Sequence, residues 1–185
     1  MTTHPQQLMQ LLQQRGHERY TGEPVTHLQH ALQAATLAER AGASDALVAA
    51  ALLHDMGHLW HGAPGTPSAD GVDDHHEALA AEVLARCFGD EVVQPVALHV
   101  AAKRRLCVNP AYLKVLTEDS LRSLALQGGP MNEAEALAFD ALPFAKDALR
   151  LRHWDDGAKR PGWDTEPLAH FWPRVAASAR LNRPG

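Results

Sequence analysis

Residues 50–58, with the sequence AALLHDMGH, place His54 and Asp55 side by side at the end of a run that is otherwise Ala and Leu. Burying a neutral polar group without a partner costs roughly 2–7 kcal/mol, and burying a charge costs more. Both side chains therefore need a compensating partner in the folded chain. A metal ion suits both at once, because imidazole and carboxylate groups are metal ligands.

Further candidate ligands lie in segments that also carry an apolar helical pattern. His30 shares a helix face with Ala and Leu residues, and His76 and His99 lie within HHEALAAEVL and VALHVAAKRRL. Asp155, in LRLRHWDDGAK, lies at an expected helix end, where the helix dipole disfavours a carboxylate unless a cation is near. Taken one at a time, these residues also fit hydrogen-bonded core histidines and a solvated helix end.

The elements that must position these residues are helices. Apolar residues recur mostly at spacings of three and four, and no segment alternates with a period of two, so we expect an all-α fold. The expected helices cover residues 5–15, 26–41, 44–57, 73–87, 91–106, 110–116, 118–126, 133–140, 143–156 and 165–180. Ser44 is expected to cap one of them, and Asn132 with Glu135 forms a capping-box pattern.

The composition fits one domain. The chain has 185 residues, of which 45% are hydrophobic and 21% charged, which is ordinary for a globular protein with a buried core. We expect a single domain over 1–185, with an N-terminal helix in 1–19, a core over 20–160 and a C-terminal helical extension over 161–185. Residues 60–74, rich in Gly and Pro, are expected to form a mobile surface loop.

Charge and cysteine content exclude several classes of protein. The net charge of -5 and the pI near 6.2 give no global positive field, so neither nucleic acid nor a membrane is an expected partner. Cys87 and Cys107 show no C-x-x-C spacing, which indicates neither a disulfide framework nor a thiolate site. No signal peptide or apolar span is present in the sequence, and we expect a cytoplasmic monomer or weak homodimer.

The ordered series of candidates resembles the HD-domain superfamily, whose members supply a histidine, a His-Asp dipeptide and a later aspartate from separate helices. Two intervening histidines match the versions that hold two metals. The series in this chain consists of His30, His54, Asp55, His76, His99 and Asp155.

If Asp55 bridges the metals, His30, His54 and Asp155 complete the protein ligands of one, and His76 and His99 those of the other. Two divalent cations against two carboxylates leave a charge of about +2, which favours an anionic ligand. A ligand set without thiolate suits Fe, Mn, Zn or Co, and the ligand count alone does not choose among them.

A narrower resemblance runs from about residue 20 to 160. The segments YTGEPVTHLQH, ALLHDMGH, HVAAKRRL, LQGGPMNEAE and LRLRHWDDGAK are similar to those of the small HD-domain phosphonate dioxygenases. That family implies an Fe(II)/Fe(III) pair with O2 as co-substrate. It also implies cleavage of the C–P bond of a 1-hydroxy-2-aminoethylphosphonate-type substrate, with a free or N-methylated amine, to phosphate and an amino acid such as glycine or glycine betaine.

The same resemblance implies roles for residues around the metals. Tyr20 should coordinate iron in the substrate-free enzyme and swing away on binding, and Glu23 should be linked to that movement and to recognition of the amino group. His58, Ser120 and Gln127 should contact the substrate. Each of these residues also has a purely structural explanation. The segment YTGEP can form a turn, His58 can be a cation at a helix end, Ser120 can be an N-cap and Gln127 can flank a turn. The sequence DDHHE departs from the family, which has an aromatic residue and a glutamine before its HE.

Lys103 follows His99 by one helical turn and so shares its face, which favours a contact with a phosphorus-centred dianion held by the metals. Arg104 and Arg105 are better explained as a cationic helix end.

Two other functions share these ligands. An HD-type phosphohydrolase would use the metal pair to generate hydroxide that attacks a small phosphate ester or nucleotide. A metal-stabilised regulatory domain would bind a ligand without turnover. Tyr20, Glu23 and LQGGPMNE favour the oxygenase through resemblance, whereas the ligand set does not discriminate.

Overall fold

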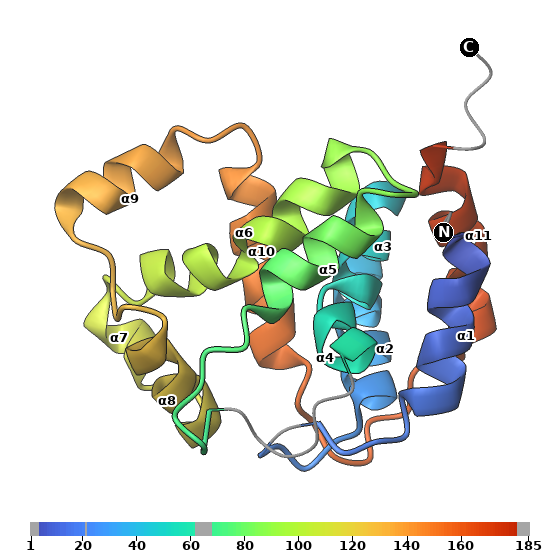
Figure 1. Cartoon of the computed structure of the whole chain (residues 1–185), viewed down its shortest axis with the longest axis horizontal. Coiled ribbons are helices and arrows are strands. Elements are labelled where there is room, and N and C mark those ends of the chain that lie inside the picture. The colour runs from blue at the N-terminus through green and yellow to red at the C-terminus, as the bar shows by residue number, and fades with distance from the viewer. Residues whose placement is uncertain (1–3, 21, 62–67, 181–185) are drawn as a thin grey trace.

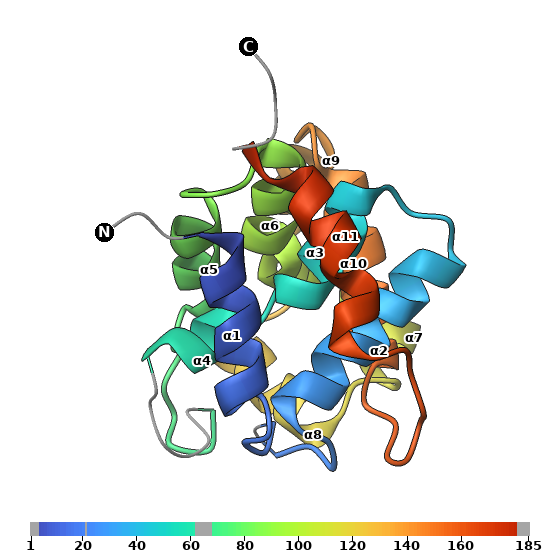
Figure 2. The same cartoon turned by 90° about the vertical axis from the view of Figure 1, so that its right-hand side faces the viewer.

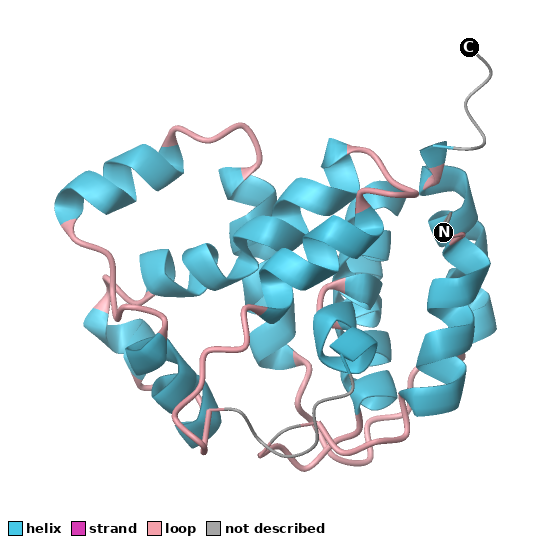
Figure 3. Ribbon diagram, in the orientation of Figure 1, coloured by secondary structure: helices cyan, strands magenta, loops and turns pink. Residues whose placement is uncertain are grey.

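The computed structural model describes residues 4–20, 22–61 and 68–180, and this part of the chain is all-α, as the sequence predicts (Figure 3). The described residues form eleven helices and no strand, with isolated bridges pairing Arg19 with Thr26 and Phe88 with Ala179. The helices are α1 (Pro5–Arg15), α2 (His27–Arg40), α3 (Asp45–Leu53), α4 (Met56–His61), α5 (His76–Leu84), α6 (Asp90–Leu106), α7 (Pro110–Leu113), α8 (Glu118–Leu126), α9 (Glu133–Asp140), α10 (Ala145–Gly157) and α11 (Leu168–Ser178).

Helix α3 is the centre of the main core. Every residue from Leu47 to Leu53 is buried, and a helix that is apolar all round must be covered on every side. Helices α2, α6, α10 and α11 pack against it. The terminal helices α1 and α11 lie on the same side of the molecule (Figures 1 and 2).

Helices α6 and α10 form the most extensive helix pair, and α10 also packs on α2 and α3. Because α10 touches all three, residues on its inner face lie near the carboxyl end of α3 and the middle of α6. Pro95 lies inside α6, and the helix continues through it. This arrangement brings together the helices that carry the predicted ligands.

Helices α7, α8 and α9 form an outer arm, seen beyond α6 in Figure 1. Two small apolar clusters attach it to the rest: Phe139 packs with Ala102 and Ala148, and Cys107 packs with Leu116 and Leu124. The arm places Ser120 and Ser123 of α8 opposite α6.

Most predicted helix boundaries agree with the observed ones to within three residues, and the side-chain caps at Ser44 and Asn132 are present. The prediction of a loop over 60–74 is wrong for Trp60 and His61, which belong to α4, and residues 62–67 lie outside the described residues. Asp70 and Gly71 form a turn. None of the helices in the described part of the chain combines the length and apolarity needed to cross a bilayer.

The predicted helix over 44–57 is divided into α3 and α4, with a break at His54 and Asp55. The Nδ1–H group of His54 donates to the carbonyl oxygen of Ala51 at 2.9 Å, so the side chain competes for an acceptor that a continuing helix would use. The amide of His58 then bonds to the carbonyl of Asp55 in a tighter turn. The break turns both ligand candidates toward α6 and α10.

Candidate metal centre

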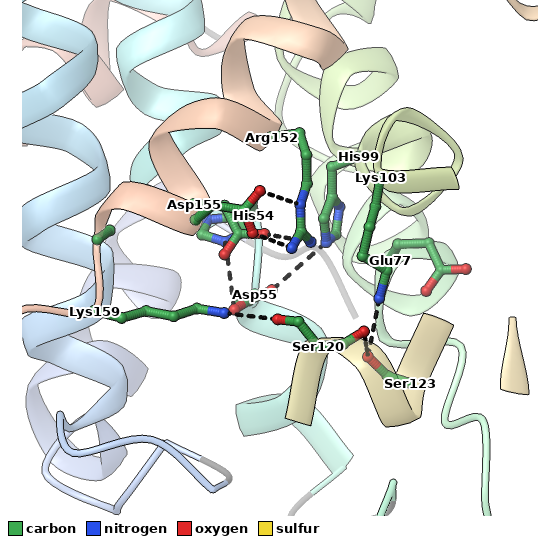
Figure 4. A network of polar contacts seen from close by, with 12 residues as sticks. His54, Asp55, Glu77, His99, Lys103, Ser120, Ser123, Arg152, Asp155 and Lys159 are labelled. Atoms are coloured by element: carbon green, nitrogen blue, oxygen red, sulfur yellow. Dashed lines mark hydrogen bonds and ion pairs between the residues drawn. The ribbon is translucent and has the colours of Figure 1, made fainter. Parts of the chain in front are cut away.

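Six side chains from five parts of the fold converge beside α10, and Figure 4 shows four of them. They come from α2, from the break after α3, from the first turn of α5, from the middle of α6 and from the last turns of α10. These are the six predicted ligands, His30, His54, Asp55, His76, His99 and Asp155.

His30, His54 and Asp155 form the first cluster, in which one ligand atom of each lies within 4.8 Å of the others. The Nε2 atoms of the two histidines are 3.2 Å apart, and the Oδ1 atom of Asp155 is 3.3 Å from Nε2 of His30. All three residues are at most 2% exposed. The three atoms therefore surround a position that water reaches only from the pocket side.

Asp55, His76 and His99 form the second cluster, and Asp55 joins it to the first. Its Oδ1 atom lies 3.7 Å from Nε2 of both His76 and His99. Its Oδ2 atom lies 3.4 Å from Nε2 of His30 and 3.3 Å from Nε2 of His54. One carboxylate thus presents one oxygen to each histidine pair, which is the arrangement of a bridging ligand.

Hydrogen bonds to the other ring nitrogen orient each imidazole. The Nδ1–H groups of His30, His54 and His99 donate to backbone carbonyls of Ala158, Ala51 and Val96 at 2.8, 2.9 and 2.7 Å. A carbonyl can only accept, so Nδ1 carries the proton and Nε2 keeps its lone pair. Nδ1 of His76 bonds to Asp74 at 2.9 Å in the same sense. Such outer contacts are typical of metal-ligating histidines.

The buried polar atoms fit a pair of metal ions. Oδ2 of Asp55 and Oδ1 of Asp155 are buried and have no hydrogen-bond partner, which is costly unless a cation satisfies them. Both orphaned oxygens point at the lone-pair sides of imidazoles. The donor set of nitrogen and carboxylate oxygen, without sulfur, fits divalent or trivalent transition metals.

The protein environment shifts the pKa values of His30 and His99 in opposite directions. Burial lowers the pKa of His30, but the nearby carboxylates of Asp155 and Asp55 outweigh that effect and raise the pKa to about 9. Burial and the neighbouring His76 lower the pKa of His99 to about 3, so this imidazole stays neutral, as a ligand must. The two carboxylates therefore attract positive charge while His99 rejects a proton.

Arg152 supports the centre from α10, and its role was not predicted from the sequence. Its Nη1 atom lies 2.8 Å from Oδ2 of Asp155, which leaves Oδ1 directed toward the histidines. The same guanidinium contacts the carboxylate of Asp156, which also accepts from the hydroxyl of Tyr112. Arg152 is 4% exposed, and the nearby carboxylates outweigh burial and hold its pKa above the usual value. The RHWDD spacing was the available signal, because residues three and four apart share a helix face.

A pocket opens onto the centre between α6, α8 and the end of α10, and its lining includes Asp55, His99 and Asp155. Lys103 lies in it, 3% exposed, and donates from Nζ to Oγ of Ser123 at 2.9 Å (Figure 4). Burial, with Arg152 nearby, lowers the pKa of Lys103 to about 7. Arg104 and Arg105 lie in the last turn of α6 and pair with Glu135 and Asp140.

Ser120 and Gln127 also line this pocket, as predicted. The Oγ atom of Ser120 accepts from Nζ of Lys159 at 3.1 Å, and Oε1 of Gln127 is buried without a hydrogen-bond partner. Ser123 and Lys159 are pocket residues that sequence reasoning missed, since a helix-surface serine and a lysine after a helix carry no distinctive pattern.

Tyr20 and Glu23 lie on the loop before α2. The ring of Tyr20 stacks on that of His30 with centroids 4.3 Å apart, and burial, followed by Asp55 and Asp155, raises the pKa of its hydroxyl well above the usual value. Glu23 is 6% exposed and accepts from the hydroxyl of Thr117 at 2.6 Å. Both residues thus adjoin the centre, with Tyr20 in its lining and Glu23 behind it.

His58 lines the pocket and stacks on His76 with ring centroids 4.1 Å apart. The carboxylate of Asp74 holds both rings, because its two oxygens each accept from an Nδ1 atom at 2.9 Å. The DDHHE sequence that departs from the family therefore supplies a carboxylate to the centre. Its neighbour His75 has a left-handed backbone, with φ of 48°, and faces solvent with 71% of its side chain exposed.

Comparisons with known proteins agree with this geometry. A family model described as HD domain matches residues 27–140. The chain is 41% identical over 166 residues to the [1-hydroxy-2-(trimethylamino)ethyl]phosphonate dioxygenase (glycine-betaine-forming) of Leisingera caerulea, an alignment that covers 89% of this chain and 85% of that protein. It is 43% identical over 170 residues to the hydroxymethylphosphonate dioxygenase of Gimesia maris, covering 91% and 84% of the two chains. An uncharacterized protein of Acanthamoeba polyphaga mimivirus is 32% identical over 167 residues, covering 89% and 76%.

Proposed function

Because the chain belongs to the HD-domain family and aligns with most of two phosphonate dioxygenases, we propose that it uses O2 to cleave the C–P bond of a 1-hydroxyphosphonate. The observation that carries this proposal is the Asp55 carboxylate, which presents one oxygen to each of two histidine pairs in a pocket that is also lined by Lys103 and Arg152. That arrangement suits an anion held by two metals.

The proposed metals are two irons, in the Fe(II) and Fe(III) states, held by the six ligands of the two clusters. When bound, such a pair supplies the redox chemistry that activation of O2 requires, and mixed histidine and carboxylate ligation with open positions is compatible with it. The protein contributes ligand orientation through the bonds at each Nδ1 atom and through Arg152.

The phosphonate is proposed to bind at the α6–α8 side of the pocket. Lys103, Ser120 and Gln127 face this space, and the Lys103 ammonium in its protonated form matches the negative charge of a phosphonate. Lys103 and Ser120 are already held by Ser123 and Lys159, so their polar atoms need little reorganisation when an anion arrives.

His58 is proposed to contact the substrate from the α4 side. Asp74 accepts from its Nδ1–H group, which leaves Nε2 as the acceptor available to a substrate hydroxyl. We propose that this Nε2 atom accepts a hydrogen bond from the hydroxyl group of the substrate.

The substrate's 1-hydroxyphosphonate unit is common to the two named relatives. With an amine-bearing substrate, free or N-methylated, the products are phosphate and an amino acid such as glycine or glycine betaine. With hydroxymethylphosphonate, oxidation of the single carbon to the carboxylate level yields formate and phosphate. Both outcomes release phosphate in proportion to the O2 consumed.

A direct experiment separates the oxygenase from an HD-type phosphohydrolase. Anaerobically purified protein should contain about two irons per chain, by simple counting of the two clusters. It should then release phosphate from 1-hydroxyphosphonates with matched O2 uptake. Equal turnover without O2, or hydrolysis of phosphate monoesters and nucleotides with Mn or Co, would overturn the proposal in favour of the hydrolase.

Tyr20 provides a spectroscopic test of the gating role proposed for it. Its ring packs on His30 beside the first cluster, which supports the proposal that its hydroxyl acts as a ligand in the substrate-free enzyme. Tyr20→Phe should retain both metals by elemental analysis but lose the visible tyrosinate-to-iron absorption of the oxidised protein. A wild-type protein without that band would contradict the role.

A further inference from the structure

Lys159, at the turn after α10, covers a buried carboxylate on the opposite wall of the pocket. Its Nζ atom lies 3.4 Å from Oε1 of Glu23, and the two side chains are only 9% and 5% exposed. The same Glu23 oxygen accepts from the hydroxyl of Thr117 at 2.6 Å. Lys159 lines the pocket whereas Glu23 does not, so the lysine separates this carboxylate from any ligand.

A second contact fixes Lys159 in that position. Its Nζ atom donates to Oγ of Ser120 at 3.1 Å, as Figure 4 shows, and it lies 5.8 Å from the ring centroid of Tyr20. Three groups from two parts of the fold, the loop before α2 and helix α8, therefore hold the ammonium. Displacing it would leave Glu23 as a buried charge whose main cationic partner is lost, which is costly.

The other carboxylates of the pocket are also engaged. Apart from Asp55 and Asp155, the lining contains Asp73, Asp74 and Asp119. Asp74 binds His58 and His76, Asp73 accepts from the backbone amide of His75, and Asp119 accepts from Ser68 and Arg122. No carboxylate that lines the pocket among the described residues is left unpaired for an ammonium group of a ligand, the two metal ligands excepted.

An aromatic cage for a quaternary ammonium group is missing from the same lining. Tyr20 is its one phenyl or indole side chain among the described residues, and that ring is already stacked on His30 and faced by Lys159. Recognition of quaternary ammonium typically uses several such rings. The undescribed segments 1–3, 21, 62–67 and 181–185 contain no Asp, Glu, Phe, Tyr or Trp in the sequence, so they cannot supply either kind of group.

Among the described residues, the pocket lining thus offers no carboxylate without a partner, other than the two candidate metal ligands, to a cationic substituent of a ligand. Lys103, Arg152 and Lys159 all line it, and bound metals add further positive charge. Building on the proposed function, we propose that Lys159 is a specificity-determining residue that neutralises Glu23 and selects 1-hydroxyphosphonates without a cationic substituent, such as hydroxymethylphosphonate. An ammonium group at the next carbon would meet Lys159 in place of a carboxylate and would be repelled.

The test compares kcat/KM for hydroxymethylphosphonate, 1-hydroxy-2-aminoethylphosphonate and its N-trimethyl form, using iron-loaded enzyme and O2. The wild type should prefer hydroxymethylphosphonate by about tenfold or more, a ratio equivalent to about 1.4 kcal/mol. Lys159→Met should reduce that preference by about tenfold, mainly through a lower KM for the ammonium-bearing compounds, because Glu23 is then uncovered.

Two further variants make the result specific. Lys159→Arg keeps the positive charge and should keep the preference, which also guards against a Lys159→Met protein that folds poorly. Lys146→Met removes an exposed lysine of α10 and should leave all three kcat/KM values unchanged. A wild type that prefers either ammonium compound, or a preference that is the same in wild type and Lys159→Met, would overturn the inference. Failure to release phosphate from all three compounds would instead overturn the proposed function.

Discussion

Asp74 is the residue that links the two histidines on the α4–α5 side of the centre. It accepts from Nδ1 of both His58 and His76, and these partners outweigh burial and hold the pKa of its carboxyl group far below the usual value. It therefore remains ionised at neutral pH. Its role is to position one candidate ligand and one candidate substrate contact with a single charge.

Asp74→Asn should weaken metal binding by about 10–100-fold, the usual effect of losing an outer hydrogen bond to a ligand. The amide presents only one acceptor oxygen, so one of the two imidazoles loses its orientation. Titration with Fe(II) under anaerobic conditions measures the effect. Asp73→Asn is the matched control, because Asp73 contacts the exposed His75 and no ligand. Equal metal affinity in both variants would argue against the positioning role.

The lowered pKa of Lys103 predicts that substrate capture depends on pH. Burial lowers its pKa to about 7, so the free enzyme holds an ammonium below that pH and a neutral amine above it. Only the ammonium attracts a phosphonate, so kcat/KM should fall by about tenfold per pH unit above the pKa.

The comparison of wild type with Lys103→Arg isolates this effect. A guanidinium stays charged throughout the range, so the alkaline fall should disappear in the variant even if its maximal kcat/KM is lower. The measurement is kcat/KM for hydroxymethylphosphonate from pH 6 to 9, chosen to bracket the pKa. An alkaline fall of the same midpoint in Lys103→Arg would assign the titration to another group.

At the residue scale, the sequence identified the groups whose chemical types are unusual in their surroundings. Histidines and a His-Asp pair within apolar helices stand out, and the structure brings all six predicted ligands into two adjoining clusters. Arg152, Lys159 and Ser123 could not be identified in the same way. Each is an ordinary residue in its local sequence, and the significance of Lys159 and Ser123 comes from partners, Glu23 and Lys103, that are distant in the chain.

Among the elements, the division between α3 and α4 has the clearest functional effect. Helical periodicity alone predicts one helix over 44–57, because it cannot detect a side chain that bonds back to the main chain. The break allows His54 and Asp55 to face different histidine pairs. The remaining helices follow their apolar patterns and caps closely, since packing and local preference agree there.

Gly57 of α4 lies against the backbone of α5, and this contact requires a glycine. A Cβ atom at this position would overlap the backbone carbonyl of His76, so α4 and α5 approach too closely for any side chain. Gly57→Ala should push the first turn of α5 away and displace the ligand that it carries. We expect a lower melting temperature and metal affinity reduced by about tenfold or more.

Gly157→Ala provides the control for that variant. Gly157 ends α10, and an added Cβ would meet only the flexible end of the Leu37 side chain at 3.0 Å. Alanine also has a higher helix propensity than glycine, so this variant should fold at least as stably as the wild type. A Gly57→Ala protein with unchanged metal affinity would show that the α4–α5 contact can relax without moving His76.

For the whole molecule, the metals are expected to act as cross-links between helices that are remote in sequence. The ligands come from α2, the α3–α4 break, α5, α6 and α10. Because the unfolded chain does not hold them together, metal binding stabilises only the folded state.

Removal of metal by chelation should therefore lower the melting temperature. Free metal at 100 times its dissociation constant stabilises by about 2.7 kcal/mol, which corresponds to a shift of about 5–10 °C for a chain of this size. Asp55→Asn should lose most of this shift, because the residue serves both clusters. His153→Asn, which alters an exposed histidine of α10, should retain it. A metal-independent melting temperature in the wild type would contradict the cross-linking role.

The fold class of the whole molecule could be predicted from the sequence, whereas the packing of α8 opposite α6 could not. Composition and periodicity were sufficient for an all-α chain, because they report local structure and burial. The arrangement of α8 opposite α6, which completes the pocket, rests on small clusters such as Cys107 with Leu116 and Leu124. Those contacts join weakly patterned segments, and nothing in the local sequence specifies them.

The order of the helices along the chain, with α10 after the other ligand-bearing helices, also has a consequence for biosynthesis. Asp155 and the Ala158 carbonyl that orients His30 are the last parts of the first cluster to be synthesised. Earlier helices can begin to pack as they leave the ribosome, since folding during translation proceeds from the amino terminus. The nascent polypeptide therefore cannot offer the complete first cluster to a metal ion before residues 155–158 have been synthesised.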